Sequence, residues 1–359
     1  MQHVTTESQT AVSNPNRQRL AMSLLLLLLL GAFVISLFVG SVRIPLDEIV
    51  RILLGATPER ETWATIVLKF RLPKALTAVL AGSALSVSGL QMQTMFRNPL
   101  AGPFVLGINS GASLGVALVV LAVGTTGGTL LAGLGLLSDF GIVVAASLGA
   151  GLVLFLVLAV ARRVETMTLL ILGLMFGYAT SALVSVLLYF SIAERIQAYI
   201  AWTFGSFGGV TWSQMRVMAP AVLLGLAIAW LSAKPLNALL LGETYAHSLG
   251  LSVRRARISV LASASLMAGA ITAFCGPIGF VGVAVPHLCR SLFSTSNHRL
   301  LIPATILLGG TVALVADLLA QLPGSQITLP LNAVTALIGA PVVTWVILRQ
   351  RNLRSSFAG

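Results

Sequence analysis

Few residues of this chain could do chemistry, and their spacing argues against catalysis. The four histidines, His3, His247, His287 and His298, form neither an H-E-x-x-H motif nor a close pair, so no catalytic metal is expected. No G-x-x-x-x-G-K-[ST] sequence occurs, which excludes ATP hydrolysis by a P-loop. We therefore expect a protein that is not an enzyme and that holds no cofactor.

Three polar groups stand isolated inside apolar stretches. Asp317 is the only acidic residue well inside such a stretch, where a charge costs at least ~2.5 kcal/mol and is kept for a function. An ion-driven carrier using Asp317 is one interpretation, and we favour the other, in which its carboxylate caps a neighbouring helix or bonds to backbone. Cys275 and Cys289 lie near opposite ends of a short stretch, so we expect them to pack as small apolar residues rather than form a disulfide or metal pair.

The elements that carry these residues are apolar stretches long enough to cross a bilayer. Hydrophobic residues make up 57% of the chain and charged residues 9%, against about a quarter in soluble domains. A span needs about 20 residues because the hydrocarbon core is about 30 Å thick. The predicted spans are Leu20–Gly40, Leu72–Met92, Phe104–Val123, Phe140–Ala161, Thr166–Phe190, Val217–Ala233, Ile258–Phe274, Pro277–Cys289, Leu300–Ala320 and Thr328–Leu348. The sequence predicts an all-α polytopic membrane protein with ten transmembrane helices.

The distribution of basic residues predicts the orientation. An even number of spans puts both termini on one side, and most of the 22 lysines and arginines then lie in cytoplasmic segments if that side is inside. We expect residues 1–19 to form a polar cytoplasmic tail, residues 20–348 the transmembrane domain, and residues 349–359 a basic cytoplasmic tail. The net charge of +12 is scattered along membrane flanks, which argues against a nucleic-acid partner.

Glycines recur at four-residue spacing in three parts of the sequence. The repeats are Gly107, Gly111 and Gly115, then Gly173 and Gly177, then Gly205 and Gly209. This spacing places each group on one helix face, where backbones can approach closely. We expect tight helix packing at these positions.

The longest predicted cytoplasmic loop covers residues 234–257 and contains a short amphipathic pattern. After Gly242, helical spacing groups Tyr245, Ala246 and Leu249 on one face, with Glu243 and His247 on another. Such a helix could lie on the membrane surface. Because the chain has no ATP-hydrolysing site of its own, this helix could also be the contact for a separate ATPase.

Four long motifs resemble one transporter family. They are RLPKALTAVLAGSALSVSGLQMQTMFRNPLAGPFVLGINSGASLG (71–115), LLLGETYAHSLGL (239–251), AFCGPIGFVGVAVPHLCR (273–290) and LPLNAVTALIGAPVVTWVIL (329–348). Together and in this order they resemble the FecCD-type permeases, the membrane subunits of ABC importers for iron-siderophores, haem and vitamin B12. The resemblance runs from the first predicted span to the last.

This resemblance implies a fold, partners and a location. The fold is the BtuC-like fold of type II ABC importers, with ten transmembrane helices per subunit in the bacterial inner membrane. The subunit would pair with an identical or paralogous permease, bind a dimer of cytoplasmic ABC ATPases, and receive substrate from a periplasmic substrate-binding protein. Of the substrates in the family, we expect a ferric siderophore, with haem or vitamin B12 as the alternative.

The resemblance also assigns site residues. The ATPase-coupling residues would be Gly242, Glu243, Tyr245, Ala246, Leu249 and Gly250. The cytoplasmic gate would be formed by Asn98, Pro99 and Leu100, with Thr166 and Met167 as further counterparts. Arg71 and Lys74 match basic residues that dock the binding protein, whereas Gln321 stands where a third basic residue is common. Asn332 replaces a frequent glycine and is either a polar lining residue or a local hydrogen-bonding substitute.

Overall fold

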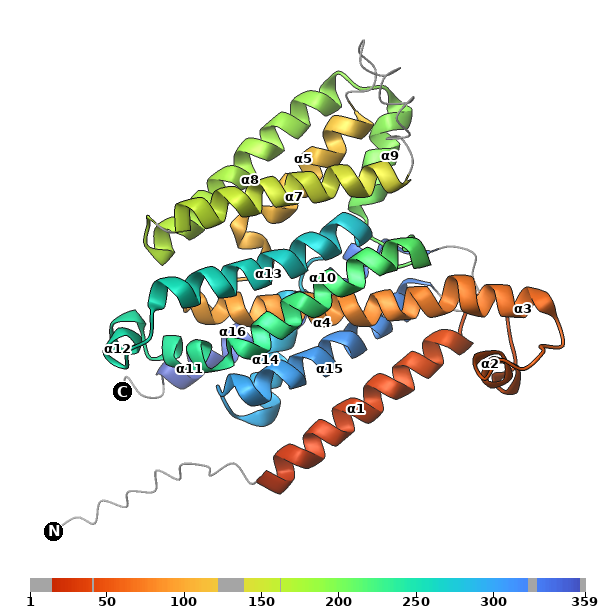
Figure 1. Ribbon diagram of the computed structural model, residues 1–359, viewed down its shortest axis with the longest axis horizontal. Helices are drawn as coiled ribbons and strands as arrows, with labels where there is room; N and C mark the ends of the chain where they lie inside the picture. The colour runs from red at the N-terminus through yellow and green to blue at the C-terminus, as the bar shows by residue number, and fades with distance from the viewer. Residues whose placement is uncertain (1–14, 41, 122–138, 162, 322–327, 356–359) are drawn as a thin grey trace.

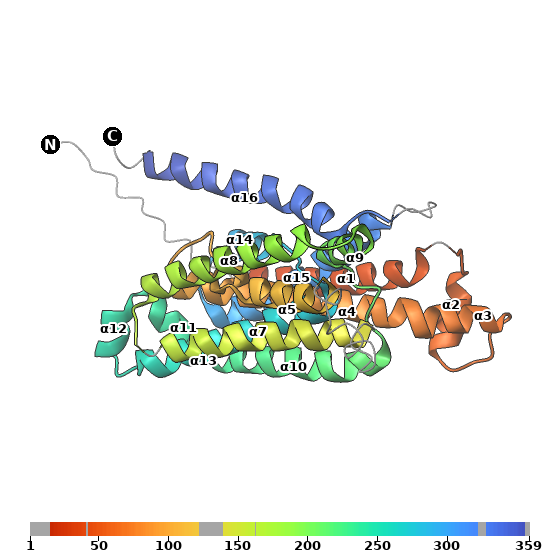
Figure 2. The same ribbon diagram turned by 90° about the horizontal axis from the view of Figure 1, so that it is seen from above.

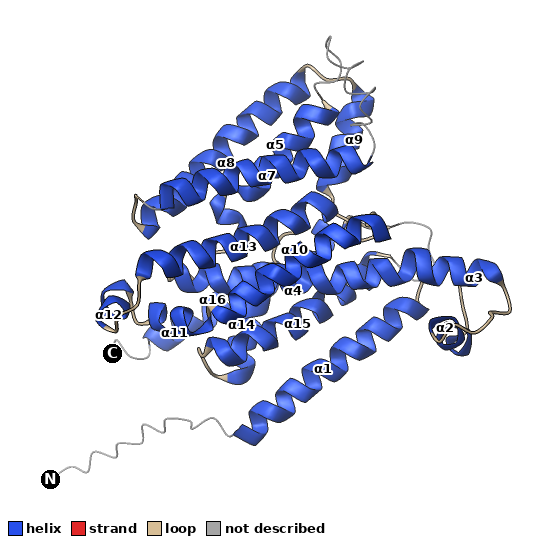
Figure 3. Cartoon of the chain, viewed as in Figure 1, coloured by secondary structure: helices blue, strands red, loops and turns tan. Residues whose placement is uncertain are grey.

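The computed structural model describes residues 15–40, 42–121, 139–161, 163–321 and 328–355. Throughout these residues the regular structure is helical (Figure 3). Seven helical segments in the described part are long and apolar enough to cross a membrane, and the shorter apolar helices are Ile108–Val120, Val281–Phe293 and Leu331–Trp345. Together they match the ten predicted spans and confirm the predicted fold class.

The membrane-length elements are joined by several shorter helices. The first set is α1 (Pro15–Phe38), α4 (Leu72–Met95), α5 (Ile108–Val120), α7 (Asp139–Ala161), α8 (Thr166–Tyr189), α10 (Trp212–Leu231), α13 (Val253–Cys275), α14 (Val281–Phe293), α15 (His298–Ala320) and α16 (Leu331–Ser355). The connecting helices are α2 (Leu46–Leu53), α3 (Glu61–Thr65), the π-helix η1 (Ile66–Arg71), the 3-10 helix η2 (Pro103–Leu106), α9 (Ala193–Thr203), α11 (Ala233–Leu240) and α12 (Glu243–Ser248). The described ends of the two predicted tails, residues 15–19 and 349–355, are helical, while residues 1–14 and 356–359 lie outside the described part.

Three helix boundaries differ from the prediction for backbone reasons. The third span begins at Ile108 rather than Phe104, because Gly107 adopts a φ of +75° and separates η2 from α5. The eighth begins at Val281 rather than Pro277, because Gly276 and Phe280 have positive φ values. The second is longer than predicted, since α3, η1 and α4 join into one apolar segment, 61–95.

Helix α4 lies at the centre of the bundle. It packs against α10, α13, α14 and α15, while α5, α7 and α8 form a group that reaches this centre through α13 (Figure 1). α16 runs along the side of α14 and α15 (Figure 2). Two polar side chains on α4 bond to α13 inside the bundle, where no water is available as a partner: Ser88 Oγ donates to the Ala264 carbonyl at 2.9 Å and Gln91 Nε2 to Ser263 Oγ at 3.1 Å.

The two ends of the bundle differ in their connecting helices. α11 and α12 lie at one end, together with the start of α1 and the end of α16, and we call this the α12 end (Figures 1 and 2). α2, α3 and α9 lie at the opposite end, which we call the α9 end. The residues predicted to gate and to couple gather at the α12 end, and those predicted to dock a binding protein gather at the α9 end.

Candidate functional site

Helix α12 is bracketed by two glycines in backbone conformations that disfavour other residues. Gly242 has a φ of +108° and Gly250 a φ of +79°, and the helix between them runs from Glu243 to Ser248. Tyr245 and Leu249 are 51% and 61% exposed, so an apolar surface faces outward as the sequence predicted.

Ala246 departs from that prediction. It is fully buried and packs in a small cluster with Leu239 of α11 and Ala256 of α13. A helix of this length turns one face to the protein, and Ala246 lies on that face rather than beside Tyr245. Its methyl group therefore anchors α12, and a direct contact with an ATPase is not available to it.

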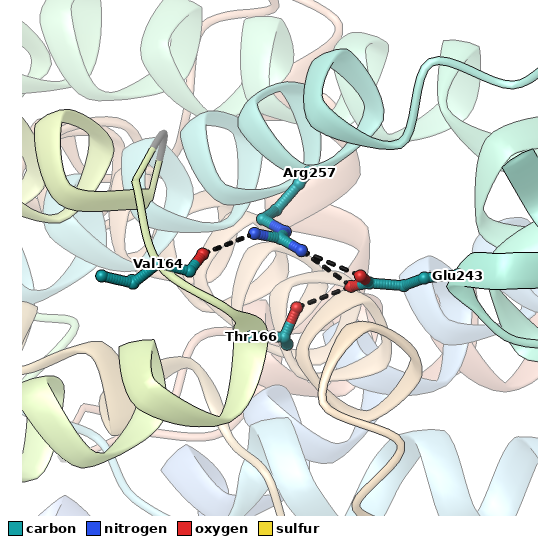
Figure 4. A network of polar contacts seen from close by, with 4 residues as sticks. All are labelled: Val164, Thr166, Glu243 and Arg257. Carbon is teal, nitrogen blue, oxygen red and sulfur yellow. Dashed lines mark hydrogen bonds and ion pairs between the residues drawn. The ribbon is translucent and has the colours of Figure 1, made fainter.

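A polar network joins α12 to α13 and to the first turn of α8 (Figure 4). Arg257 Nη2 donates to both carboxylate oxygens of Glu243 at 2.9 and 3.0 Å, and Arg257 Nη1 donates to the Val164 carbonyl at 2.8 Å. Thr166 Oγ1 donates to the same Glu243 carboxylate at 2.7 Å. The Glu243 carboxylate of α12 thus bonds directly to two other helices, to α8 through Thr166 and to α13 through Arg257.

The environment of Glu243 keeps its carboxylate charged. Partial burial raises the pKa of Glu243, but the hydrogen bonds from Thr166 and Arg257, with the charges of Arg257 and Arg97, outweigh this and leave the pKa below its ordinary value. The carboxylate therefore stays ionised near neutral pH and keeps accepting these bonds.

The turn between α4 and η2 also contacts the segment before α12. Arg97, with a φ of +48°, donates from Nη2 to the Leu240 carbonyl at 3.1 Å. In the same turn Asn98 Oδ1 accepts from the Leu100 amide at 2.9 Å, and His287 Nε2 donates to the Pro99 carbonyl at 2.7 Å. The N-P-L turn is thus fixed by its own Asn98 and by α14.

The two predicted gate segments therefore both reach the coupling loop, one through Arg97 and one through Thr166. Leu100 and Met167 are 48% and 66% exposed, so each segment also presents an apolar side chain at the surface of the subunit. Sequence reasoning treated Arg97 and Arg257 only as cytoplasmic charges, and their bonding partners could not be read from spacing.

The sequence resemblance assigned Arg71, at the α9 end, to docking of a binding protein, but its side chain is not free. Its side chain is buried, and its guanidinium donates to the carbonyls of Leu37, Phe38 and Val42. The first two are carbonyls at the end of α1, which lack partners within the helix and carry the negative end of its dipole. Arg71 caps α1, and this structural role replaces the predicted exposed one.

Lys74 is also paired inside the subunit rather than free at the surface. Its Nζ lies 3.0 Å from Asp317 Oδ1, and Gln321 Nε2 donates to Asp317 Oδ2 at 2.7 Å. The Lys74 side chain is 25% exposed and that of Asp317 9%. Asp317 therefore has an ion-pair partner, which corrects our expectation that it caps a helix or bonds to backbone.

Three cavities lie near α9, a helix that the sequence analysis did not predict. One of about 450 Å³ is lined by Lys74, Asp317 and Gln321, and an adjoining one of about 360 Å³ shares Ser206 with it. The third, of about 200 Å³, is lined by hydroxyl and amide groups: Asn109, Ser110, Ser113, Thr180, Ser181 and Tyr199. Among the described residues lining these cavities, the charged ones are the paired Lys74 and Asp317.

Asn332, at the start of α16, makes local hydrogen bonds. Its side-chain Oδ1 accepts from the backbone amide of Gly279 at 3.0 Å, and its backbone amide donates to the Phe204 carbonyl at 3.0 Å. Of the two interpretations of this residue, the structure favours the local one.

Known proteins with similar sequences align with almost the whole length of this chain. The vitamin B12 import system permease protein BtuC of Klebsiella pneumoniae is 39% identical over 328 residues, which cover 91% of this chain and 93% of that protein. The BtuC protein of Shigella boydii is 36% identical over 336 residues, or 93% and 96% of the two chains.

A solved structure matches the fold as well. It is described as an inward-facing conformation of a metal-chelate type ABC transporter, and it aligns with a TM-score of 0.77 at 31% identity over 91% of this chain and 98% of that one. The model of the FecCD transport family matches residues 26–349. The bundle, its two polar ends and these matches together identify the chain as a member of the FecCD transport family.

Proposed function

We propose that this ABC importer permease carries vitamin B12 across the bacterial inner membrane. The observation that carries the proposal is the 39% identity to a vitamin B12 permease over 91% of the chain. This favours the alternative of our sequence-based reading over the ferric siderophore. A metal chelate remains the second candidate, because the solved relative is described as a metal-chelate type transporter.

The chemistry of the cavities supports a ligand rich in uncharged hydrogen-bonding groups. The cavity between α5, α8 and α9 is lined by hydroxyl and amide side chains together with Val184, and the Lys74–Asp317 pair in the cavity of about 450 Å³ is internally neutralised. Carboxamides, which surround the corrin ring of vitamin B12, can both donate to and accept from such groups. A strongly anionic chelate would instead favour unpaired basic residues along the path.

In this proposal the α12 end faces the cytoplasm and both termini lie there. The exposed Tyr245 and Leu249 contact a separate ATPase, which hydrolyses the ATP, and the turns at residues 98–100 and 166–167 form the cytoplasmic gate. A second permease subunit completes the translocation path. A substrate-binding protein docks at the α9 end, where Lys74 is reached only by opening its pair with Asp317.

The test is a binding screen with the assembled complex. The permease is purified with its ATPase and its binding protein, and the complex is titrated with vitamin B12, ferric siderophores and haem. Selective release of bound vitamin B12 from the binding protein on addition of the permease–ATPase complex and ATP is expected. Selective release of a ferric siderophore would make the metal-chelate candidate correct.

A further inference from the structure

The network around Glu243 joins two segments that backbone packing leaves separate. α12 packs against α11 and α13, whereas α12 and α8 make no comparable helix contact in the described part of the chain. The link between them consists of the Thr166–Glu243 bond and of Arg257, which bonds to Glu243 and to the Val164 carbonyl (Figure 4). A displacement of α12 would therefore reach α8 through these side chains.

We propose that Glu243 and Arg257 are positioning residues that make α12 and the first turn of α8 move as one unit during transport. This inference rests on the proposed function, because it takes α12 as the element that the ATPase moves. It assigns the two residues a role in coupling ATP hydrolysis to the gate, beyond the contact that the exposed face of α12 makes with the ATPase.

The geometry suits transmission better than stabilisation. Glu243 is 46% exposed, and exposed ion pairs contribute little to folding stability. Arg257 is only 13% exposed, and its planar guanidinium bonds in two directions at once, to a carboxylate and to a backbone carbonyl. Such charge-assisted bonds fix orientation as well as distance. The pair therefore defines where α12 sits relative to the 163–166 turn.

A second tether lies on the other gate segment and serves as a comparison. Arg97 bonds to the Leu240 carbonyl, so that turn is tied by a hydrogen bond to the backbone before α12, while its charge acts on Glu243 only through space. Loss of the Glu243 carboxylate removes the link to α8 and leaves this tether in place. The two gate segments should then respond differently to ATP.

The experiment uses the permease reconstituted in liposomes with its ATPase and binding protein. Vitamin B12 transported per ATP hydrolysed is measured for Glu243→Gln, Arg257→Gln, the double variant and Thr166→Val, with Thr166→Ser as the matched control that keeps the hydroxyl. Each single loss should lower this ratio about tenfold, the factor expected when one charge-assisted hydrogen bond is removed from a two-state equilibrium. The double variant should be no worse than Glu243→Gln alone, because without the Glu243 carboxylate Arg257 no longer connects α12 to Val164.

A second measurement on the same complexes needs no substrate. Spin labels at positions 248 and 167 report the distance between α12 and α8, with and without ATP. This distance should stay constant in the wild type and change with ATP in Glu243→Gln. The inference would be overturned if Glu243→Gln transported as much vitamin B12 per ATP as the wild type, or if the losses of the two single variants multiplied in the double variant. It would also be overturned if the distance between positions 248 and 167 responded to ATP in the same way in the wild type and in Glu243→Gln. Absence of vitamin B12 transport in the wild type, with the distances behaving as expected, would instead overturn the proposed substrate.

Discussion

At the scale of single residues, Glu243 determines how the α12–α8 link depends on pH. Because the folded protein holds the pKa of Glu243 below its ordinary value of 4.5, the link is fully present above that value and is lost only as the pH falls through the lowered pKa. We predict that the distance between spin labels at positions 248 and 167 is the same at every pH from neutral down to 4.5. A change above pH 4.5 would show that another group controls the link.

The Lys74–Asp317 pair gives a prediction about stability. Asp317→Asn leaves the Lys74 ammonium without its counter-charge while keeping the size of the side chain. In burial, the Lys74–Asp317 pair is intermediate between two kinds of ion pair. An exposed pair is worth ~0.2–1 kcal/mol, and disruption of a buried pair costs ~3–5 kcal/mol. We expect a loss of about 1–3 kcal/mol in the free energy of unfolding, measured by denaturation in detergent.

The control for that substitution is Glu61→Gln, which removes an exposed carboxylate at the same end of the molecule. It should leave the stability unchanged. Equal stabilities of Asp317→Asn and the wild type would contradict the ion pair as described.

The sequence could predict that Asp317 has a partner, but not that the partner is Lys74. Because a buried charge must find a partner, Asp317 required a basic or hydrogen-bonding group at the same depth, and Lys74 lies at the start of the predicted second span. The choice of Lys74 over Arg71 depends on which residue caps α1, and that contact joins elements 34 residues apart. The sequence therefore predicted that the charge of Asp317 is retained for a reason, whereas the packing of α1, α4 and α15 determines which groups it bonds to.

At the scale of elements, the exposed face of α12 is expected to be an interface. Leu249→Asp places a charge on an apolar surface that the proposal assigns to the ATPase, and burying an unpaired charge costs several kcal/mol. We predict that this variant inserts into the membrane normally but no longer co-purifies with the ATPase. Leu54→Asp is the control and should co-purify as the wild type does, because Leu54 is an even more exposed leucine (80% against 61% for Leu249) that follows α2 at the opposite end.

The contact between α4 and α14 depends on glycine. A Cβ atom added to Gly89 would overlap the Gly282 carbonyl, whereas one added to Gly151 of α7 meets no atom within 4 Å. Overpacking of this kind costs about 1–3 kcal/mol. We predict that Gly89→Ala lowers the thermal unfolding temperature in detergent and that Gly151→Ala does not, because alanine is favoured over glycine in an open helical position. A loss in both variants would contradict the close approach of α4 and α14.

Hydropathy predicted the long helices and their order, because length and apolar content alone determine which segments cross a bilayer. Glycine spacing predicted close packing, and Gly111 and Gly115 do approach α7 at Gly149 and Ala145. The same spacing was misleading at Gly209, where a Cβ atom would meet open space. The breaks at Gly107 and Phe280 were not predicted, because single positive φ values leave no trace in hydropathy. The helix α9 was not predicted because it has only 11 residues, fewer than the about 20 that a span needs.

At the scale of the whole molecule, the account depends on two ends with different tasks. The α12 end holds the proposed coupling helix and both proposed gate turns, and the α9 end holds the cavities. The sequence contains no P-loop motif, and our proposal assigns ATP hydrolysis to a separate subunit. The ion-driven carrier based on Asp317 loses its main support, because that carboxylate is held by Lys74 and Gln321.

The most direct test of the central claim is vitamin B12 uptake into liposomes that contain the permease and its ATPase, with the binding protein outside and ATP inside. The account predicts uptake that requires both ATP and the binding protein, and that ceases when the ATPase partner is made unable to hydrolyse ATP. Uptake driven by a proton gradient without ATP, or ATP-driven uptake of a ferric siderophore but not of vitamin B12, would contradict it.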